Sequence, residues 1–355
     1  MSPQISVILP VYNSDAYLGA AVASIVSQSF RDFELLAIDG GSTDASRRIL
    51  GEFAQSDARI RIVPQSGRGL VGALNEGIAL ARGEFLARMD ADDISLPERF
   101  ARQIEFLRRN PDIAVVGSAM TLIDAEGRSV RDIVYPQQPA DVARALEGGS
   151  ALAHPAVMMR RDAVQRAGGY RAVLEFAEDY DLWLRMSEHA SLANLPDKLL
   201  QYRHHATKRG CVFAFEQELH TQIARLSAAA RRAGRADRLD GITTLGISDI
   251  GRFELSAERR EQLICDLVEP LLGASKPQEL ARVEEVFRLI GKPVSRSRVG
   301  RRKLDLAMRL LRTRRFSPAA VWAIRAGATA PLETLAVLAS LGVRAPRKLA
   351  ALLWR

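Results

Sequence analysis

Three carboxylates at the end of an apolar run could act together in chemistry. Residues 85–89, apolar except for one arginine, lead into Asp90, Ala91, Asp92 and Asp93. If a strand continues through this run, its alternation turns Asp90 and Asp92 to the same side, with Ala91 opposite. Like charges held together are costly unless a cation lies between them, and hard oxygen ligands suit Mg²⁺ or Mn²⁺. The alternative is a solvated acidic turn that caps the next helix.

Two further acidic sites stand where the chain changes from one element to the next. Asp39 ends the apolar run 33–38 and is followed by a glycine-rich turn. Glu178 and Asp179 open a segment, 178–186, with helical periodicity. Acids in the first turn of a helix also complement its dipole, so this structural role competes with a catalytic one.

The elements around these acids indicate a parallel sheet. Apolar runs at 5–10, 33–38, 60–63 and 85–89 alternate with helical patterns, which is typical of a doubly wound α/β sheet. Ligands bind outside the carboxyl ends of the strands in such a sheet. We therefore expect the turns that follow these strands to share one edge.

The second half of the sequence changes twice in character. After a helix at 96–109, strands are predicted at 113–117, 157–159 and 199–203, and a hairpin at 120–134, so the sheet becomes mixed. From residue 206 the sequence is rich in Ala, Leu and Arg and has few strand signals. The sequence predicts an α/β domain over 1–205 and an all-helical, Arg-rich domain over 206–355.

Composition limits the compartment and the partners. The 355 residues carry a formal net charge of +8, which is compatible with nucleic acid, anionic lipid or a phosphorylated substrate as a partner. The two cysteines show no metal-type spacing and indicate a reducing compartment. A signal peptide and an apolar run of about 18 residues are both missing, so a cytoplasmic protein without a membrane span is expected.

Four segments carry a resemblance to a known family. The segments VILPVYN (7–13), IDGGSTD (38–44), ARMDADD (87–93) and AEDYDLW (177–183) occur in the order and spacing of the family 2 glycosyltransferases. The resemblance covers roughly residues 4–205. It implies the GT-A fold, a Rossmann-like mixed sheet flanked by helices, and inverting transfer from a UDP-sugar to an acceptor hydroxyl with Mg²⁺ or Mn²⁺. One departure is Gly40, which stands where the family usually has a second acid.

The resemblance also implies which residues bind the nucleotide. Asp39 would accept a hydrogen bond from the uracil N3–H, and the turn after the first strand would contact the base. Asp90 would lie nearest the ribose, and Arg88 would either hold the acids or touch the diphosphate. The implied nucleotide-binding residues are Pro10, Val11, Tyr12, Asn13, Asp39, Arg88 and Asp90.

The remaining implied roles concern the metal, the base and the acceptor. Asp90, Asp92 and His205 would hold the metal ion, and Asp93 would orient the loop. Asp179 would be the general base, with Glu178 as the alternative. The residues implied for the acceptor or sugar pocket are His154, Gly168, Gly169, Tyr170 and Trp183, although Trp183 could be core and the others turn residues.

Three other functions compete with this interpretation. A glycoside hydrolase also uses paired carboxylates, but the alternating strand and helix pattern argues against it. A basic nucleic-acid-binding protein has support only from the arginines, without a recognition motif, so no nucleic-acid partner is expected. The third is a protein that binds nucleotide-sugar without transfer, against which the joint presence of Asp90, Asp92 and Asp179 argues.

The expected setting is polysaccharide assembly at the cell envelope. The family resemblance implies capsule, O-antigen or other envelope glycans, with a glycan or lipid-linked acceptor, while sugar and linkage depend on pocket shape. Basic residues crowd 296–315 beside an apolar stripe, a pattern typical of a helix on anionic lipid. Peripheral contact with the inner face of the cell membrane is therefore predicted; a helical bundle with a solvated basic face is the alternative.

Overall fold

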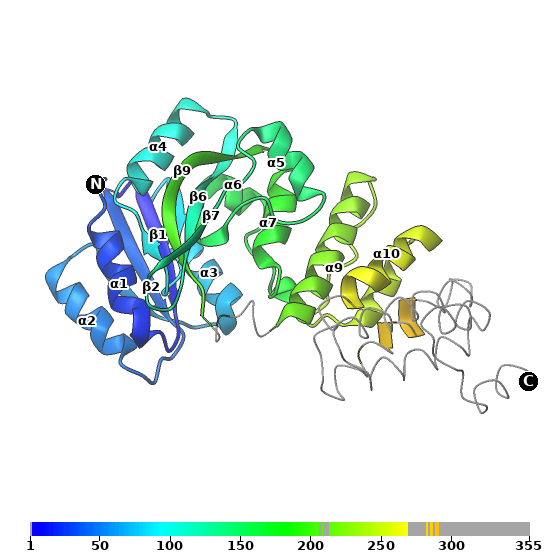
Figure 1. Ribbon diagram of the computed structural model, residues 1–355, viewed down its shortest axis with the longest axis horizontal. Helices are drawn as coiled ribbons and strands as arrows, with labels where there is room; N and C mark the ends of the chain where they lie inside the picture. The colour runs from blue at the N-terminus through cyan, green and yellow to red at the C-terminus, as the bar shows by residue number, and fades with distance from the viewer. Residues whose placement is uncertain are drawn as a thin grey trace, which may run out of the picture. The chain divides into compact units, whose positions relative to one another are not determined.

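The computed structural model of the chain describes residues 2–205, 208, 213–268 and a few positions between 282 and 290 (Figure 1). The chain divides into two compact units. The first combines Met1–Val212 with Ala224–Thr243, and the second combines Phe213–Ile223 with Thr244–Arg355. The candidate site lies in the first unit.

One mixed sheet forms the centre of the first unit. Its order is β3-β2-β1-β4-β8-β6-β9-β5, with β7 paired to β6. The strands are β1 Ile5–Val11, β2 Phe33–Asp39, β3 Ile60–Pro64, β4 Phe85–Arg88, β5 Ile94–Ser95, β6 Ile113–Ile123, β7 Ser129–Ile133, β8 Met158–Arg160 and β9 Ser191–Arg203. The predicted mixed sheet is confirmed.

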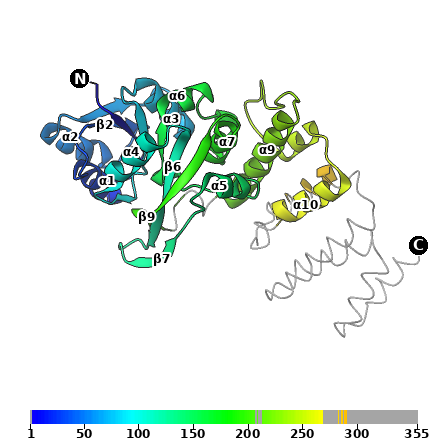
Figure 2. The ribbon, with the colours of Figure 1, turned by 90° about the horizontal axis from the view of Figure 1, so that it is seen from above.

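The first four strands are parallel, as the alternating pattern predicted. β1 pairs with β2 and β4, and β2 pairs with β3. Helices α1 Asp15–Val26, α2 Ser46–Ser56 and α3 Gly69–Leu80 connect these strands, and helices cover both faces of the sheet (Figures 1 and 2). This cover explains why every residue of β2 is buried. Gly77 lets α3 approach closely, since a Cβ there would lie 2.5 Å from Ile8 Cγ2.

The second half of the sheet contains longer strands than the sequence predicted. β6 runs through both the predicted strand 113–117 and the first arm of the hairpin, whose second arm is β7. β9 begins at Ser191, eight residues before the predicted start, because Pro196 and Asp197 interrupt the apolar pattern without ending the pairing with β6. β8 is antiparallel to both β4 and β6.

Several helices frame the candidate site. They are α4 Arg99–Arg109, α5 Pro139–Leu146, α6 Arg161–Arg166 and α7 Glu178–Met186, together with the short 3₁₀ turns η1 His154–Ala156 and η2 Ala172–Leu174. α4 begins three residues later than predicted because Ile94 and Ser95 pair with β9. α5 and α6 were not predicted, whereas α7 lies where the sequence placed it.

The described part of the C-terminal half is helical, as predicted. It contains α9 Ala214–Arg232, η3 Ile247–Arg252 and α10 Ala257–Val268. Within the described residues, none of the helices combines the length and apolar character that crossing a membrane requires. The basic segment 296–315 and the apolar residues after it lie outside the described residues.

One buried carboxylate ties the amino-terminal end of the parallel strands. Glu34, at the start of β2, forms ion pairs with Arg61 at 2.9 Å and with Arg82 at 2.7 Å, and its side chain is 3% exposed. Ser6 Oγ donates a hydrogen bond of 2.7 Å to the same carboxylate. Burial alone would raise the pKa of Glu34, but the bonds from Arg82, Ser6 and Arg61 hold it below the ordinary value.

We expect Glu34→Gln to lower the free energy of unfolding by about 1–3 kcal/mol at pH 7, because charged partners of a buried group are left unpaired. A lowered folded-state pKa stabilises the fold above the ordinary glutamate pKa. This contribution is lost as the pH falls through the lowered value, so the difference between wild type and variant should shrink in acid. Urea unfolding across this pH range measures it. Equal stabilities at pH 7 would contradict the assignment.

Candidate functional site

The carboxyl ends of β1, β2 and β4 meet at one edge of the sheet. Val11, the last residue of β1, is in register with Asp39, the last residue of β2. Arg88 ends β4 opposite Ile8 of β1. The turns that follow these strands therefore lie side by side, as the sequence predicted, at the edge where α/β sheets bind ligands.

Asp39 is a buried, ionised acceptor at this edge. Its Oδ1 accepts a hydrogen bond of 3.0 Å from the Ser42 backbone N–H, and its Oδ2 pairs with the Arg47 guanidinium. Burial alone would raise the pKa of Asp39, but the bonds from Ser42 and Arg47 lower it. Arg47 was not predicted, because an arginine in the first turn of a helix has no motif around it.

The turn after β1 is bonded to the turn after β2. Gly40 N–H donates to the Val11 carbonyl at 2.8 Å, and Thr43 N–H donates to Asn13 Oδ1 at 2.8 Å. Asn13 adopts a positive φ of 45°. Tyr12 is 65% exposed beside this turn. A Cβ at Gly40 would lie 3.0 Å from Gln65 Oε1 and 3.5 Å from the Tyr12 ring, so a larger residue would crowd both side chains.

Asp90 and Asp92 come together as predicted, but not for the predicted reason, and Asp93 joins them. One carboxylate oxygen from each of Asp90, Asp92 and Asp93 lies within 4.8 Å of the others. β4 ends at Arg88, and Ala91 and Asp92 lie in a turn. The alternation argument was therefore wrong, because strand geometry stops before the acids. The turn brings in Asp93 as well, which alternation would have pointed away.

Asp93 is the buried member of this cluster. Its side chain is 0% exposed, and its Oδ1 accepts hydrogen bonds from the Arg203 backbone N–H at 2.9 Å and from Lys208 Nζ at 3.1 Å. Among the described residues its Oδ2 has no hydrogen-bond partner. Burial, together with the charges of Asp90 and Asp92, raises the pKa of Asp93 to about 7.

Two residues from the end of β9 and beyond complete the cluster. His205 Nε2 lies 2.9 Å from Asp92 Oδ2, in agreement with its predicted place. Lys208 Nζ lies 3.3 Å from the same oxygen and was not predicted. The three carboxylates, including the unpartnered Asp93 Oδ2, are oxygen donors that fit Mg²⁺ or Mn²⁺, and the His205 imidazole lies beside Asp92. In this structure the ammonium of Lys208 balances Asp92 and Asp93.

Arg88 links this cluster to the rest of the edge. It is 3% exposed and forms an ion pair of 2.6 Å with Asp90 Oδ1. Its Nε and Nη1 have no hydrogen-bond partner within the part of the chain that the structure describes. The ion pair is therefore present, and two buried guanidinium nitrogens, which carry three N–H bonds, have no partner among the described residues.

Asp179 lies in the first turn of α7 and interacts electrostatically with Arg88 and Asp90. Its Oδ1 accepts a hydrogen bond of 2.7 Å from the Tyr180 backbone N–H. Burial raises the pKa of Asp179, with Asp90 adding to the effect and Arg88 opposing it. A raised pKa makes this carboxylate a stronger base than an ordinary aspartate, and its partial exposure lets a substrate reach it. Glu178, the alternative, is 8% exposed.

The residues predicted for the acceptor pocket are mostly buried. His154 Nε2 and Tyr170 Oη lie 2.8 Å apart, and burial with the charge of Arg88 lowers the pKa of His154. Trp183 is 0% exposed and meets His154 edge-on at 6.0 Å. Its predicted role as a sugar-stacking face is therefore wrong, and the core alternative holds.

Gly168 and Gly169 have positive φ values of 80° and 68°, which a glycine adopts without strain.

Comparisons with known proteins agree on one family. Residues 6–168 match the model of Glycosyl transferase family 2. The O-antigen biosynthesis glycosyltransferase WbnJ of Escherichia coli is 33% identical over 218 residues, which cover 60% of this chain and 85% of that protein.

Two solved structures share the fold. TarS 1–349 of S. aureus in complex with UDP-GlcNAc has a TM-score of 0.57 at 17% identity, covering 91% of this chain and 90% of that one. Mannosyltransferase PcManGT from Pyrobaculum calidifontis, in complex with GDP-Man and Mn²⁺, has a TM-score of 0.51 at 16% identity. The match covers 99% of this chain and 84% of that one. The predicted GT-A fold is confirmed.

We expect Lys208→Met to bind Mn²⁺ at least about tenfold more tightly in the absence of nucleotide, because the ammonium and the ion repel each other among the same carboxylates. Electron paramagnetic resonance of free Mn²⁺ measures the affinity. Lys198→Met is the matched control, since Lys198 pairs with Asp132 at 2.9 Å on the surface. Unchanged or weaker Mn²⁺ binding by Lys208→Met would show that the two cations do not compete.

Proposed function

Because the chain belongs to family 2 of the glycosyltransferases, we propose that it is an inverting enzyme that moves a sugar from a UDP-sugar to an acceptor hydroxyl. The observation that carries this proposal is the gathering of three kinds of group at one sheet edge. These are the buried carboxylate of Asp39, the acidic cluster beside Arg88, whose Nε and Nη1 have no partner among the described residues, and Asp179, whose pKa is raised and which interacts electrostatically with Arg88 and Asp90.

The proposed donor site begins at Asp39. A carboxylate that stays ionised accepts a hydrogen bond from the N3–H of uracil, and Tyr12 offers an exposed aromatic surface next to it. The Arg47 guanidinium, 59% exposed, pairs with Asp39 Oδ2 and must share or release that oxygen. Cytosine has no N3–H in its neutral form, so this carboxylate favours uracil over cytosine, while thymine offers the same N3–H as uracil.

The proposed diphosphate site lies between the acidic cluster and Arg88. Asp90, Asp92, Asp93 and His205 would hold Mg²⁺ or Mn²⁺, and the ion would supply positive charge for the leaving diphosphate. The unpartnered Nε and Nη1 of Arg88 would donate to the same group. The metal ion and the Arg88 guanidinium would together neutralise the negative charge that develops on the leaving diphosphate.

The proposed chemistry takes place between this site and α7. Asp179 would remove the proton from the acceptor hydroxyl as the oxygen attacks the anomeric carbon from the side opposite the diphosphate. A single displacement of this kind inverts the configuration at that carbon. The raised pKa of Asp179 suits this role, because a base works best when its pKa is near the working pH.

The acceptor is proposed to be a glycan of the cell envelope, since the relative WbnJ is named for O-antigen biosynthesis. We propose a catalytic domain over 1–205 followed by a helical region over 206–355, of which residues 224–243 belong to the same compact unit as the catalytic domain. A lipid-linked acceptor and contact of the basic segment 296–315 with anionic membrane stay predictions, because those residues lie outside the described part of the chain.

The proposal predicts release of UDP when the chain is incubated with a UDP-sugar and Mn²⁺. A panel of UDP-, GDP- and dTDP-sugars identifies the donor, with a coupled nucleotide assay as the readout. Excess EDTA should lower the rate by at least about a hundredfold, and added Mn²⁺ should restore it, because Arg88 carries a single positive charge that is already paired with Asp90 and does not by itself neutralise the leaving diphosphate. Full activity in EDTA, or turnover of none of the donors, would overturn the proposal.

A further inference from the structure

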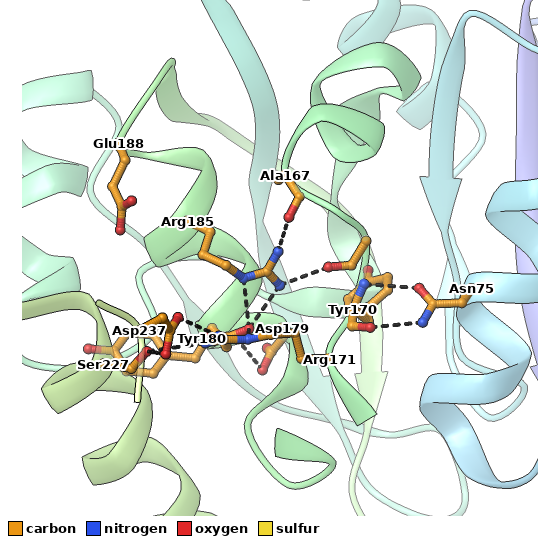
Figure 3. Close-up of polar contacts among 12 residues, drawn as sticks. Asn75, Ala167, Tyr170, Arg171, Asp179, Tyr180, Arg185, Glu188, Ser227 and Asp237 are labelled. Carbon is orange, nitrogen blue, oxygen red and sulfur yellow. Dashed lines mark hydrogen bonds and ion pairs between the residues drawn. The ribbon is translucent and has the colours of Figure 1, made fainter. Parts of the chain in front are cut away.

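Six charged side chains form a connected network behind the start of α7. The arginine–carboxylate network consists of Arg171, Asp181, Arg185, Glu188, Arg231 and Asp237. Figure 3 labels Arg171, Arg185, Glu188 and Asp237 of this set. The network balances three guanidinium groups against three carboxylates. None of the six side chains is more than 21% exposed. The sequence analysis assigned no role to any member.

Asp181 is the centre of the network. It lies on α7 two residues after Asp179, and its side chain is 0% exposed. Arg171 donates to it from Nε at 2.9 Å and also from Nη2, and Arg185 donates from Nε at 2.9 Å. One buried carboxylate is thus held between two planar guanidinium groups, which fixes its side chain in position and direction.

Arg185 connects α7 to the glycine turn before η2. Its Nη2 donates to the Gly169 carbonyl at 2.8 Å, and its Nη1 donates to the Ala167 carbonyl (Figure 3). On the other side of this turn, Asn75 of α3 bonds both the N–H and the carbonyl of Tyr170, at 2.9 and 2.8 Å. The turn 167–170 is therefore held between α7 and α3.

The outer half of the network reaches residues 224–243, which belong to the same compact unit. Arg171 Nη1 donates to Asp237 Oδ2 at 2.6 Å, and Arg231 Nη1 donates to the same oxygen at 2.8 Å. Arg231 Nε also donates to Glu188 Oε1 at 2.9 Å, just beyond the end of α7. Both ends of α7 are thereby tied to one set of charges.

We infer that the arginine–carboxylate network positions Asp179 relative to the donor site, and that residues 224–243 are part of the apparatus that does so. This inference rests on the proposed function of Asp179. Burying paired charges contributes little to stability compared with apolar packing, whereas a guanidinium fork fixes geometry in two directions. The contacts of Arg185 fix geometry in this way, because one guanidinium joins α7, which carries Asp179, to the turn 167–170.

Tyr170 completes the connection to the donor side. Its hydroxyl lies 2.8 Å from His154 Nε2, and the charge of Arg88 acts on both side chains. A shift of the turn 167–170 would therefore disturb the surroundings of Arg88 as well as α7. The network members are positioning residues, because none of them lies among the groups that face the proposed substrates.

The test compares two variants of the network with one control in the full chain. Arg185→Lys keeps the charge next to Asp181 but loses the fork that reaches the Ala167 and Gly169 carbonyls. Asp237→Asn keeps the shape but removes the outer charge. Glu34→Gln is the matched control, because Glu34 is also a buried carboxylate between two arginines, at the opposite end of β2. Asp179→Asn is a reference variant that shows how far kcat falls when the proposed base itself is removed.

Two measurements are made on each variant, well below its melting temperature. The first is the kinetics of UDP release from the UDP-sugar that wild type uses, with Mn²⁺ and with water as the acceptor, together with UDP affinity. The second is hydrogen exchange of the backbone amides at 167–170 and 179–182, which does not depend on activity.

We expect Arg185→Lys and Asp237→Asn to lower kcat at least about tenfold, with KM for the donor and UDP affinity within about twofold of wild type. Asp179→Asn should lower kcat by about 100- to 10,000-fold. Exchange at 167–170 and 179–182 should be faster in both network variants and unchanged in Glu34→Gln, whose kcat should match wild type.

Wild-type kcat in both network variants would overturn the inference and leave the proposed function intact. An equal loss of kcat in Glu34→Gln, or a loss of UDP affinity parallel to kcat, would also overturn it, because the effect would then be general destabilisation or donor binding. A wild-type chain that turns over no donor of the panel would overturn the proposed function and the inference together. Unchanged exchange would show that the network does not order these segments.

Discussion

A buried guanidinium is the constraint on which the rest of the site depends. Arg88 ends a central strand at 3% exposure, and a charge in that place is stable only with opposite charge beside it. Asp90 provides that charge at 2.6 Å and, against the effect of burial, keeps the pKa of Arg88 above its ordinary value. The same positive charge lowers the pKa of His154 and opposes the rise in the pKa of Asp179. Arg88 therefore acts electrostatically on Asp90, His154 and Asp179 together.

The acidic turn after β4 faces a second electrostatic constraint, the mutual repulsion of its carboxylates. Three carboxylates within 4.8 Å repel one another, and the protonation of Asp93 near neutral pH together with the ammonium of Lys208 relieves that repulsion. A divalent ion would do so more strongly, because it brings twice the charge to the same oxygens. Arg203 and His205 hold this turn in place through contacts to Asp93 and Asp92.

The sequence predicted the parts of the site that follow strands and could not predict the parts that depend on distant contacts. Asp39, Asp90 and Asp92 were found because an apolar run ending in acids is a local pattern, and α7 was found because its acids precede a periodic segment. Arg47 and Lys208 were missed because their partners lie eight and more than a hundred residues away, with no motif between. The network around Asp181 was missed for the same reason. Trp183 was predicted for the pocket because a tryptophan near acids is compatible with either core packing or sugar stacking. The two roles are distinguished only by its tertiary contacts, such as the one with His154.

The most direct test of the account is a crystal structure of the chain with UDP and Mn²⁺, with the ion located by its anomalous scattering. The account predicts one strong peak bound by Asp92 and at least one of its acidic neighbours, with the diphosphate within hydrogen-bond distance of Arg88 Nε or Nη1 and the uracil N3 facing Asp39. Lys208 Nζ should have moved away from Asp92. An ion bound elsewhere, or a nucleotide whose phosphates leave Arg88 without contact, would contradict it.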